Sequence, residues 1–292
     1  MKKRTPAVRS ESPASDRETV RLNRYLALNG IASRRHADFL IEKGEVMVDG
    51  DIVTELGLRI DPTQQRVEVD GIVLRPEGEQ RRYYVLHKPP GVVCTSDPRE
   101  NRPRAVDMIS DRKKGRIYTV GRLDEDTTGL VILTNDGDFA NRIAHPRYGI
   151  RKTYRVTVRG RVDGVRLQKL RDGVRCSDFR SSFERVHLVK RSERQTTLLV
   201  TLSEGRNREI RRTFARLDLP VTRLRRVEIG PLRERGLKVG HWRPLTREEV
   251  RELIDAGEAE NLPPRKPRRP LRPARGAAGA GRRRPNIGRR GS

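Results

Sequence analysis

Three consecutive carboxylates, Asp124, Glu125 and Asp126, lie in a chain whose formal net charge is +26. They belong to the segment GRLDEDTTG, between two apolar runs that are typical of buried strands. A side chain at the end of a strand is held rigidly, which suits catalysis. An ionised carboxylate can act as a nucleophile or stabilise a developing cation, as in glycosidic chemistry. From the residues alone, however, a loop of surface salt bridges is the more common explanation.

The same loop resembles the opening of a calcium site, but the resemblance fails along its length. Asp124, Asp126, Thr128 and Gly129 fit the first half of an EF-hand loop, whereas its twelfth position is Asn135 instead of a bidentate glutamate. The sequence also contains no phosphate-binding glycine loop and no nucleophile elbow. Its five histidines and two cysteines are scattered, which predicts reduced thiols and no zinc site. We therefore expect neither a metal nor a cofactor.

The charge balance favours a nucleic-acid partner. Beyond Glu260 the sequence has no acidic residue but eleven basic ones, and the rest of the chain is basic as well. No apolar run approaches the ~20 residues needed to span a bilayer, and the first residues lack the apolar core of a secretory signal. These features predict a cytoplasmic protein that binds nucleic acid and not a membrane.

Residues 1–19 are polar and are predicted to be disordered, whereas residues 20–74 are predicted to form a small module. A short helix stops at Gly30, a second helix begins after Ser33, and an Asp49–Gly50 turn joins two strands of a hairpin. Along the second helix the sequence places Arg34, Arg35 and Lys43. These three side chains fit a solvated helix face and a contact with RNA equally well.

Residues 75–82 are predicted to be a linker and residues 83–258 a second domain. Strands and helices alternate irregularly in this domain, which indicates an α+β fold with a mixed sheet. Thr246 and Glu249 form the pattern of a capping box for a final helix. Residues 262–292 consist mainly of Arg, Pro, Gly and Ala, so we expect a disordered basic tail.

Several segments, in order, resemble motifs of the pseudouridine synthases, in the branch of the small-subunit rRNA synthase A and large-subunit rRNA synthase B families. GRLDEDTTGLVILTNDG resembles the catalytic motif, and HKPPGVVCT, KTYRV and EGRNREIRR resemble the Lys-Pro, tyrosine and arginine motifs. The segment from Arg21 to Gly50 resembles the alpha-L RNA-binding module of that branch. The resemblance implies a pseudouridine synthase fold with a mixed, largely antiparallel β-sheet, preceded by this module.

The resemblance also implies roles for individual residues. Asp124 matches the catalytic aspartate, and Tyr154 matches the tyrosine that packs against the flipped uracil. Arg211 resembles the arginine that pairs with the aspartate. Arg122 resembles the arginine that enters the base stack, and Arg208 is expected to contact the RNA.

We thus expect an rRNA pseudouridine synthase that isomerises a specific uridine without a cofactor. The segment EGRNRE, with Glu209 where several relatives have Gln, is most similar to the large-subunit synthase B group. The expected partner is large-subunit ribosomal RNA or a pre-ribosomal particle, and the expected state is a monomer. The alternative is a non-catalytic rRNA-binding or assembly factor that retains the fold.

Overall fold

The computed structural model describes residues 19–75, 79–181 and 183–261. The predicted basic tail and nearly all of the predicted disordered N-terminus lie outside the described residues, as does part of the predicted linker. Within the described part of the chain, no helix combines the length and the apolar character needed to cross a membrane.

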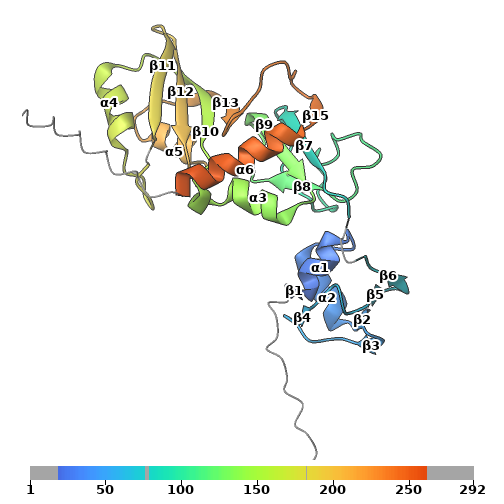
Figure 1. The fold of residues 1–292 in the computed structure, drawn as a ribbon. Helices are drawn as coiled ribbons and strands as arrows, with labels where there is room; N and C mark the ends of the chain where they lie inside the picture. Colours follow the sequence, from blue (N-terminus) through green and yellow to red (C-terminus); the bar gives the residue numbers. More distant parts are fainter. Residues whose placement is uncertain (1–18, 76–78, 182, 262–292) are drawn as a thin grey trace, which may run out of the picture. The chain divides into compact units, whose positions relative to one another are not determined.

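Two short helices lie near the start of the N-terminal module (Figure 1). Helix α1 (Leu22–Leu28) is followed by Gly30 in a left-handed conformation, with φ of 74°. Helix α2 (Arg34–Glu42) begins after Ser33, whose hydroxyl accepts a hydrogen bond from the His36 backbone N–H at 3.2 Å. Both predicted helix boundaries are confirmed.

The strands of the module form two small sheets, one of two strands in the order β1-β4 and one of four in the order β3-β2-β5-β6. Asp49 and Gly50 both have positive φ and connect β2 to β3, which confirms the predicted hairpin. The buried apolar residues that surround α1 and α2 all fall between Leu22 and Leu74, so the module has its own core. The strands are β1 (Val20–Arg21), β2 (Val46–Val48), β3 (Asp51–Ile52), β4 (Arg59–Ile60), β5 (Val67–Val69) and β6 (Ile72–Val73).

The second part of the chain is organised around a nine-stranded sheet whose main order is β11-β12-β10-β13-β9-β7-β15. Strand β14 pairs with β13, and β8 pairs with β9. Every pairing is antiparallel except that between β13 and β9, which confirms a mixed, largely antiparallel sheet. The strands are β7 (Tyr83–Lys88), β8 (Tyr118–Val120), β9 (Thr128–Thr134), β10 (Lys152–Arg159), β11 (Arg185–Arg191), β12 (Gln195–Leu202), β13 (Val221–Ile229), β14 (Leu232–Arg233) and β15 (Trp242–Pro244).

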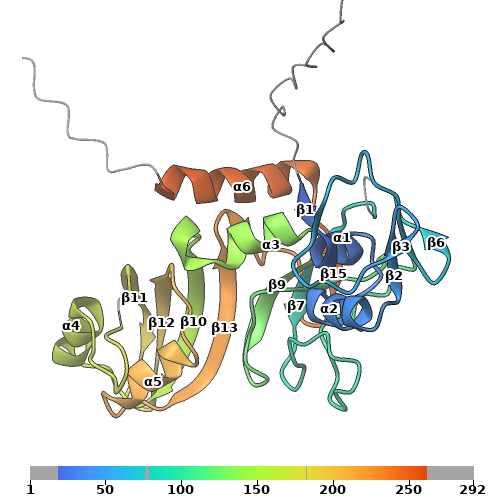
Figure 2. The same cartoon turned by 90° about the horizontal axis from the view of Figure 1, so that it is seen from below.

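Side chains on both faces of this sheet are buried in separate hydrophobic clusters. In β9, Val131 and Leu133 join one cluster, and the alternate residues Leu130 and Ile132 join the other. Helices α4 and α5 contribute to the first cluster, whereas α3 and α6 contribute to the second and run along one side of the sheet (Figure 2). The helical segments are α3 (Gly137–Ala144), η1 (Pro146–Tyr148), α4 (Gly164–Asp172), α5 (Glu209–Ala215) and α6 (Arg247–Asn261).

The capping box that the sequence predicted for the last helix is confirmed. The Glu249 backbone N–H donates to the Thr246 hydroxyl at 3.1 Å, and the Thr246 backbone N–H donates to the Glu249 carboxylate at 2.9 Å. Helix α6 then continues to Asn261, three residues beyond the predicted end of the domain.

The sequence YYVLHKPPGVVCT, residues 83–95, predicts a strand, a turn and a second strand, and the second of these strands is wrong. The segment after the Lys-Pro-Pro-Gly turn forms only an isolated bridge between Val93 and Arg104. The Val93 N–H donates to the Pro103 carbonyl, but a proline has no N–H with which to extend a ladder. Strands β11 and β13 were not predicted, although β13 is the strand that joins β9 to β10.

Candidate active site

The acidic loop connects β8 to β9 and ends where β9 meets β13. This parallel pairing is short, with Thr128 opposite Arg225 and Gly129 opposite Arg226. The sheet therefore brings the loop beside β10, β12 and the start of α5, which are distant in sequence. A pocket of about 90 Å³ lies at this junction, and its lining includes Arg122, Asp124, Tyr154, Arg208, Glu209 and Leu224.

Each of the three carboxylates of the loop lies closest to a different arginine. Only Asp124 lines the pocket, and its side chain is 28% exposed, compared with 48% for Glu125 and 54% for Asp126. The shortest pairs are Asp124 with Arg208 at 3.4 Å, Glu125 with Arg102 at 2.9 Å and Asp126 with Arg211 at 2.9 Å, and Arg208 also lies 4.0 Å from Asp126. Of the three carboxylates of the loop, Asp124 is thus the one at the pocket.

The pairing predicted for Arg211 is corrected by the structure. Its guanidinium lies against Asp126 and also donates to the Val221 carbonyl at 3.3 Å, so it is held away from Asp124. Arg208 takes the place beside Asp124 because it caps α5 in a left-handed conformation, with φ of 48°, one helical turn before Arg211. The arginine motif thus contains the residue that pairs with Asp124, but that residue is Arg208 instead of Arg211.

The side chain of Lys88 supports the acidic loop through hydrogen bonds. This lysine is fully buried at the end of β7, and its ammonium donates to the carbonyls of Pro89, Val92 and Glu125 at 2.9, 2.6 and 3.0 Å. The Glu125 carbonyl also accepts the Gly91 N–H at 2.9 Å. Burial lowers the pKa of Lys88, and the nearby carboxylates oppose that shift. Sequence reasoning noted the Lys-Pro-Pro-Gly turn but gave Lys88 no role.

Tyr154 lies on β10 between Val200 of β12 and Arg226 of β13. Its side chain is buried, and its hydroxyl lies 3.5 Å from the Arg226 guanidinium. Sequence reasoning missed Arg226. The available signal was a basic residue two positions after buried Leu224, on the same face of an alternating strand.

Two further residues shape the pocket. Glu209 is buried in the first turn of α5, and its carboxylate accepts the Arg206 backbone N–H at 3.0 Å. Burial raises the pKa of Glu209. Arg122 is exposed beside the pocket, and it forms no ion pair with the carboxylates of the described residues.

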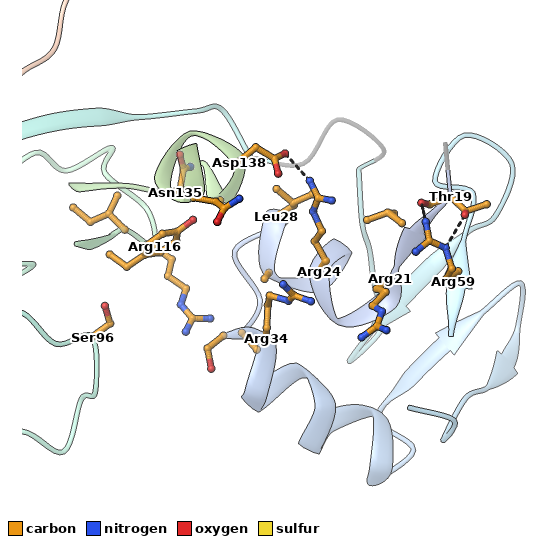
Figure 3. Close-up of a pocket in the computed structure, with 18 residues that line it drawn as sticks. Thr19, Arg21, Arg24, Leu28, Arg34, Arg59, Ser96, Arg116, Asn135 and Asp138 are labelled. Atoms are coloured by element: carbon orange, nitrogen blue, oxygen red, sulfur yellow. Dashed lines mark hydrogen bonds and ion pairs between the residues drawn. The ribbon is translucent and has the colours of Figure 1, made fainter. Parts of the chain in front are cut away.

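The predicted RNA-contacting residues of the module, Arg34, Arg35 and Lys43, are all exposed. Among the residues that the structure describes, no carboxylate forms a salt bridge with them. The Lys43 ammonium lies 5.5 Å from the centre of the Phe39 ring, which is 47% exposed. Figure 3 shows Arg34 extending from α2, whereas Arg59 is held by Thr19, whose hydroxyl accepts at 2.9 Å. Contact of the three residues with RNA stays a prediction.

Comparison with known families agrees with both parts of the chain. A family model described as RNA pseudouridylate synthase matches residues 82–216, and one described as S4 domain matches residues 20–65. The predicted RNA-binding module and the predicted enzyme family are both confirmed.

Individual relatives extend the match over most of the chain. The chain is 40% identical over 235 residues to the ribosomal large subunit pseudouridine synthase B of Bacillus subtilis, covering 80% of this chain and 95% of that protein. It is 36% identical to an uncharacterised RNA pseudouridine synthase of Aquifex aeolicus, covering 84% and 97% of the two chains. A solved pseudouridylate synthase superposes with a TM-score of 0.57 and 30% identity, covering 80% of this chain and all of that one. The chain therefore belongs to the family of RNA pseudouridine synthases.

Proposed function

We propose that this enzyme isomerises a specific uridine of large-subunit ribosomal RNA to pseudouridine and that Asp124 is its catalytic carboxylate. The observation that carries the proposal is that Asp124 alone, of three adjacent acids, lines the pocket at the junction of β9 and β13. The large-subunit substrate is supported by the resemblance to the relative from Bacillus subtilis, whose name states that class of RNA.

The reaction rearranges bonds within one nucleotide. The bond between ribose C1′ and uracil N1 breaks, the ring turns, and a bond forms between C1′ and C5. A proton leaves C5 and one is taken up at N1, so atoms and electrons balance without a cofactor. Asp124 either attacks C1′ or takes part in forming a glycal-like intermediate. Both routes require a carboxylate held close to the sugar, and the contact with Arg208 orients it.

The target nucleotide must leave the base stack before its glycosidic bond can be reached. We assign Tyr154 to packing against the flipped base, because its side chain lines the pocket opposite the acidic loop. Arg122 is exposed beside Asp124, and we assign it to the gap that the base leaves in the RNA. Arg208 and Arg211 support the acidic loop, Arg208 through Asp124 and Asp126 and Arg211 through Asp126.

The proposal is tested by mapping pseudouridine in ribosomal RNA from cells that contain or lack the gene. We expect one position of large-subunit RNA to lose its modification in the deletion strain. Wild-type protein and Glu125→Gln should restore it, whereas Asp124→Asn should not. An unchanged pseudouridine pattern in the deletion strain would instead favour a non-catalytic RNA-binding or assembly factor. A lost position in small-subunit RNA would contradict the substrate class.

A further inference from the structure

Arg226 is a buried cation at the centre of the catalytic sheet. Its side chain is only 4% exposed, and none of the salt bridges among the described residues includes it. Burying a guanidinium without a carboxylate is unfavourable unless its N–H groups find acceptors. The acceptors that Arg226 does find lie on the two strands that flank it, β9 and β10.

The register of the sheet determines which residues of β9 and β10 lie beside Arg226. Arg226 lies opposite Tyr154 on β10 and opposite Gly129 on β9. A Cβ atom on Gly129 would lie 2.2 Å from the Arg226 carbonyl oxygen, so β9 approaches β13 as closely as it does only because residue 129 has no side chain. The Arg226 Nε donates to the Leu130 carbonyl at 2.7 Å, which anchors the guanidinium to the strand that follows the acidic loop.

The Nη1 side of the guanidinium contacts the Tyr154 hydroxyl. Nη1 of Arg226 lies 3.5 Å from the Tyr154 hydroxyl, and Nη2 is buried without a hydrogen-bond partner among the described residues. A guanidinium can only donate, so the Tyr154 oxygen must be the acceptor in this contact. The hydroxyl proton of Tyr154 is therefore directed away from Arg226 and is free to reach an acceptor in the pocket.

We propose that Arg226 is a positioning residue that fixes the Tyr154 hydroxyl as an acceptor toward the sheet and a donor toward the bound nucleotide. The inference deepens the proposed function and rests on it for the identity of the nucleotide. A carbonyl oxygen of the flipped pyrimidine is the chemical group that such a donor would meet. Arg226 thus couples the tyrosine to the strand that carries the acidic loop.

The test compares Arg226→Met, Arg226→Lys and Tyr154→Phe with the double variant Arg226→Met/Tyr154→Phe, using the full chain and an rRNA fragment in single-turnover reactions. We expect Arg226→Met to slow the reaction about tenfold to a hundredfold at saturating RNA, with little change in RNA affinity. Arg226→Lys should restore part of the rate. In the Tyr154→Phe background, Arg226→Met should lower the single-turnover rate little further, because both changes remove the same contact. Effects that multiply would overturn the inference.

A second measurement does not depend on activity. In the free protein with ¹³Cζ-labelled tyrosine, the Tyr154 signal is assigned through its loss in Tyr154→Phe. Arg226→Met should shift this signal and leave those of the other five tyrosines in place, since only the Tyr154 oxygen loses a donor. An unmoved Tyr154 signal would overturn the inference. Absence of pseudouridine formation by the wild-type protein, with the signal shifted as expected, would count against the proposed function alone.

Discussion

Asp124, Glu125 and Asp126 carry the same charge in the same loop, and the nearest arginine is different for each of them. Pairing alone therefore does not distinguish them. What distinguishes Asp124 is that both it and Arg208 line the same pocket. The other two pairs lie outside the pocket lining and leave their carboxylates about half exposed.

Asparagine and glutamine substitutions in this loop test the distinction, because they remove charge with little change in volume. Asp124→Asn should lower the single-turnover rate by about 10³-fold or more while RNA binding is nearly retained. Glu125→Gln should stay within a few-fold of wild type. Asp126→Asn should fall between them, because Arg211 loses its carboxylate. Asp124→Asn with a rate close to that of wild type would remove Asp124 from the mechanism.

The buried carboxylate of Glu209 leads to a prediction about how the stability of the protein depends on pH. Burial raises the pKa of Glu209 above its ordinary value of 4.5, so the folded protein binds its proton at a higher pH than the unfolded chain does. Between those two pKa values, the contribution of Glu209 to the free energy of unfolding falls as the pH rises. Glu209→Gln has no such titration but retains an acceptor for the Arg206 N–H.

The melting temperature of Glu209→Gln relative to wild type should therefore be higher at pH 7 than at pH 4. The comparison uses the difference between the two proteins at each pH, which cancels the titration of every other group to first order. A difference that grows as the pH falls would mean that the carboxylate is stabilised by its surroundings rather than desolvated by them.

At the scale of elements, the pairing of β9 with β13 joins the two halves of the sheet through only two registered positions. Gly129 has φ of 109° and touches the Arg226 backbone, so both its conformation and its close contact exclude a side chain. Gly160 also has a positive φ, of 82°, but no atom lies within 4 Å of the position where its Cβ would be. A substitution at Gly160 therefore introduces backbone strain alone, whereas one at Gly129 introduces strain and a steric clash.

Gly129→Ala should lower the free energy of unfolding by more than about 3 kcal/mol, because strain and overpacking add. Gly160→Ala should lower it by about 1–2 kcal/mol, the strain alone. Chemical denaturation of the two variants, monitored by far-UV circular dichroism, measures both effects. Equal losses would mean that β9 and β13 can separate slightly without harm to the sheet.

At the scale of the whole molecule, a net charge of +26 provides a strong attraction to RNA. The module itself, residues 20–74, contains seven basic and nine acidic residues, so the excess of positive charge comes from the rest of the chain. Exposed basic residues lie at α2, whereas exposed acids Asp49, Asp51 and Asp70 lie at the turns of its four-stranded sheet. Phosphates should therefore meet the helices of the module rather than its strands.

Two double variants with the same change in charge test this orientation. Arg34→Gln/Arg35→Gln should weaken binding to an rRNA fragment and flatten the dependence of affinity on salt, since two phosphate contacts are lost. Arg59→Gln/Arg66→Gln removes one cation from β4 and one from the residue before β5, and it should change both quantities much less. Binding isotherms over a series of salt concentrations measure the slopes. Equal slopes for the two variants would show that the module acts through overall charge only.

The sequence by itself determined the parts that depend on neighbours along the chain. The Asp49–Gly50 turn, the Ser33 cap and the capping box of Thr246 with Glu249 all involve contacts within a few residues, and all are confirmed. The order of the motifs likewise indicated the family and the α+β class, because each motif is a continuous segment.

Only the tertiary structure decided which arginine meets which carboxylate and which side chains support the tyrosine. Arg208 lies 84 positions from Asp124, and Arg226 lies 72 positions from Tyr154. The contact of Arg226 with Tyr154 depends on the register of β10 and β13, and a shift of one residue would turn a side chain to the opposite face of the sheet. Pairing between distant strands is set by the packing of both faces, which no local pattern of residues encodes.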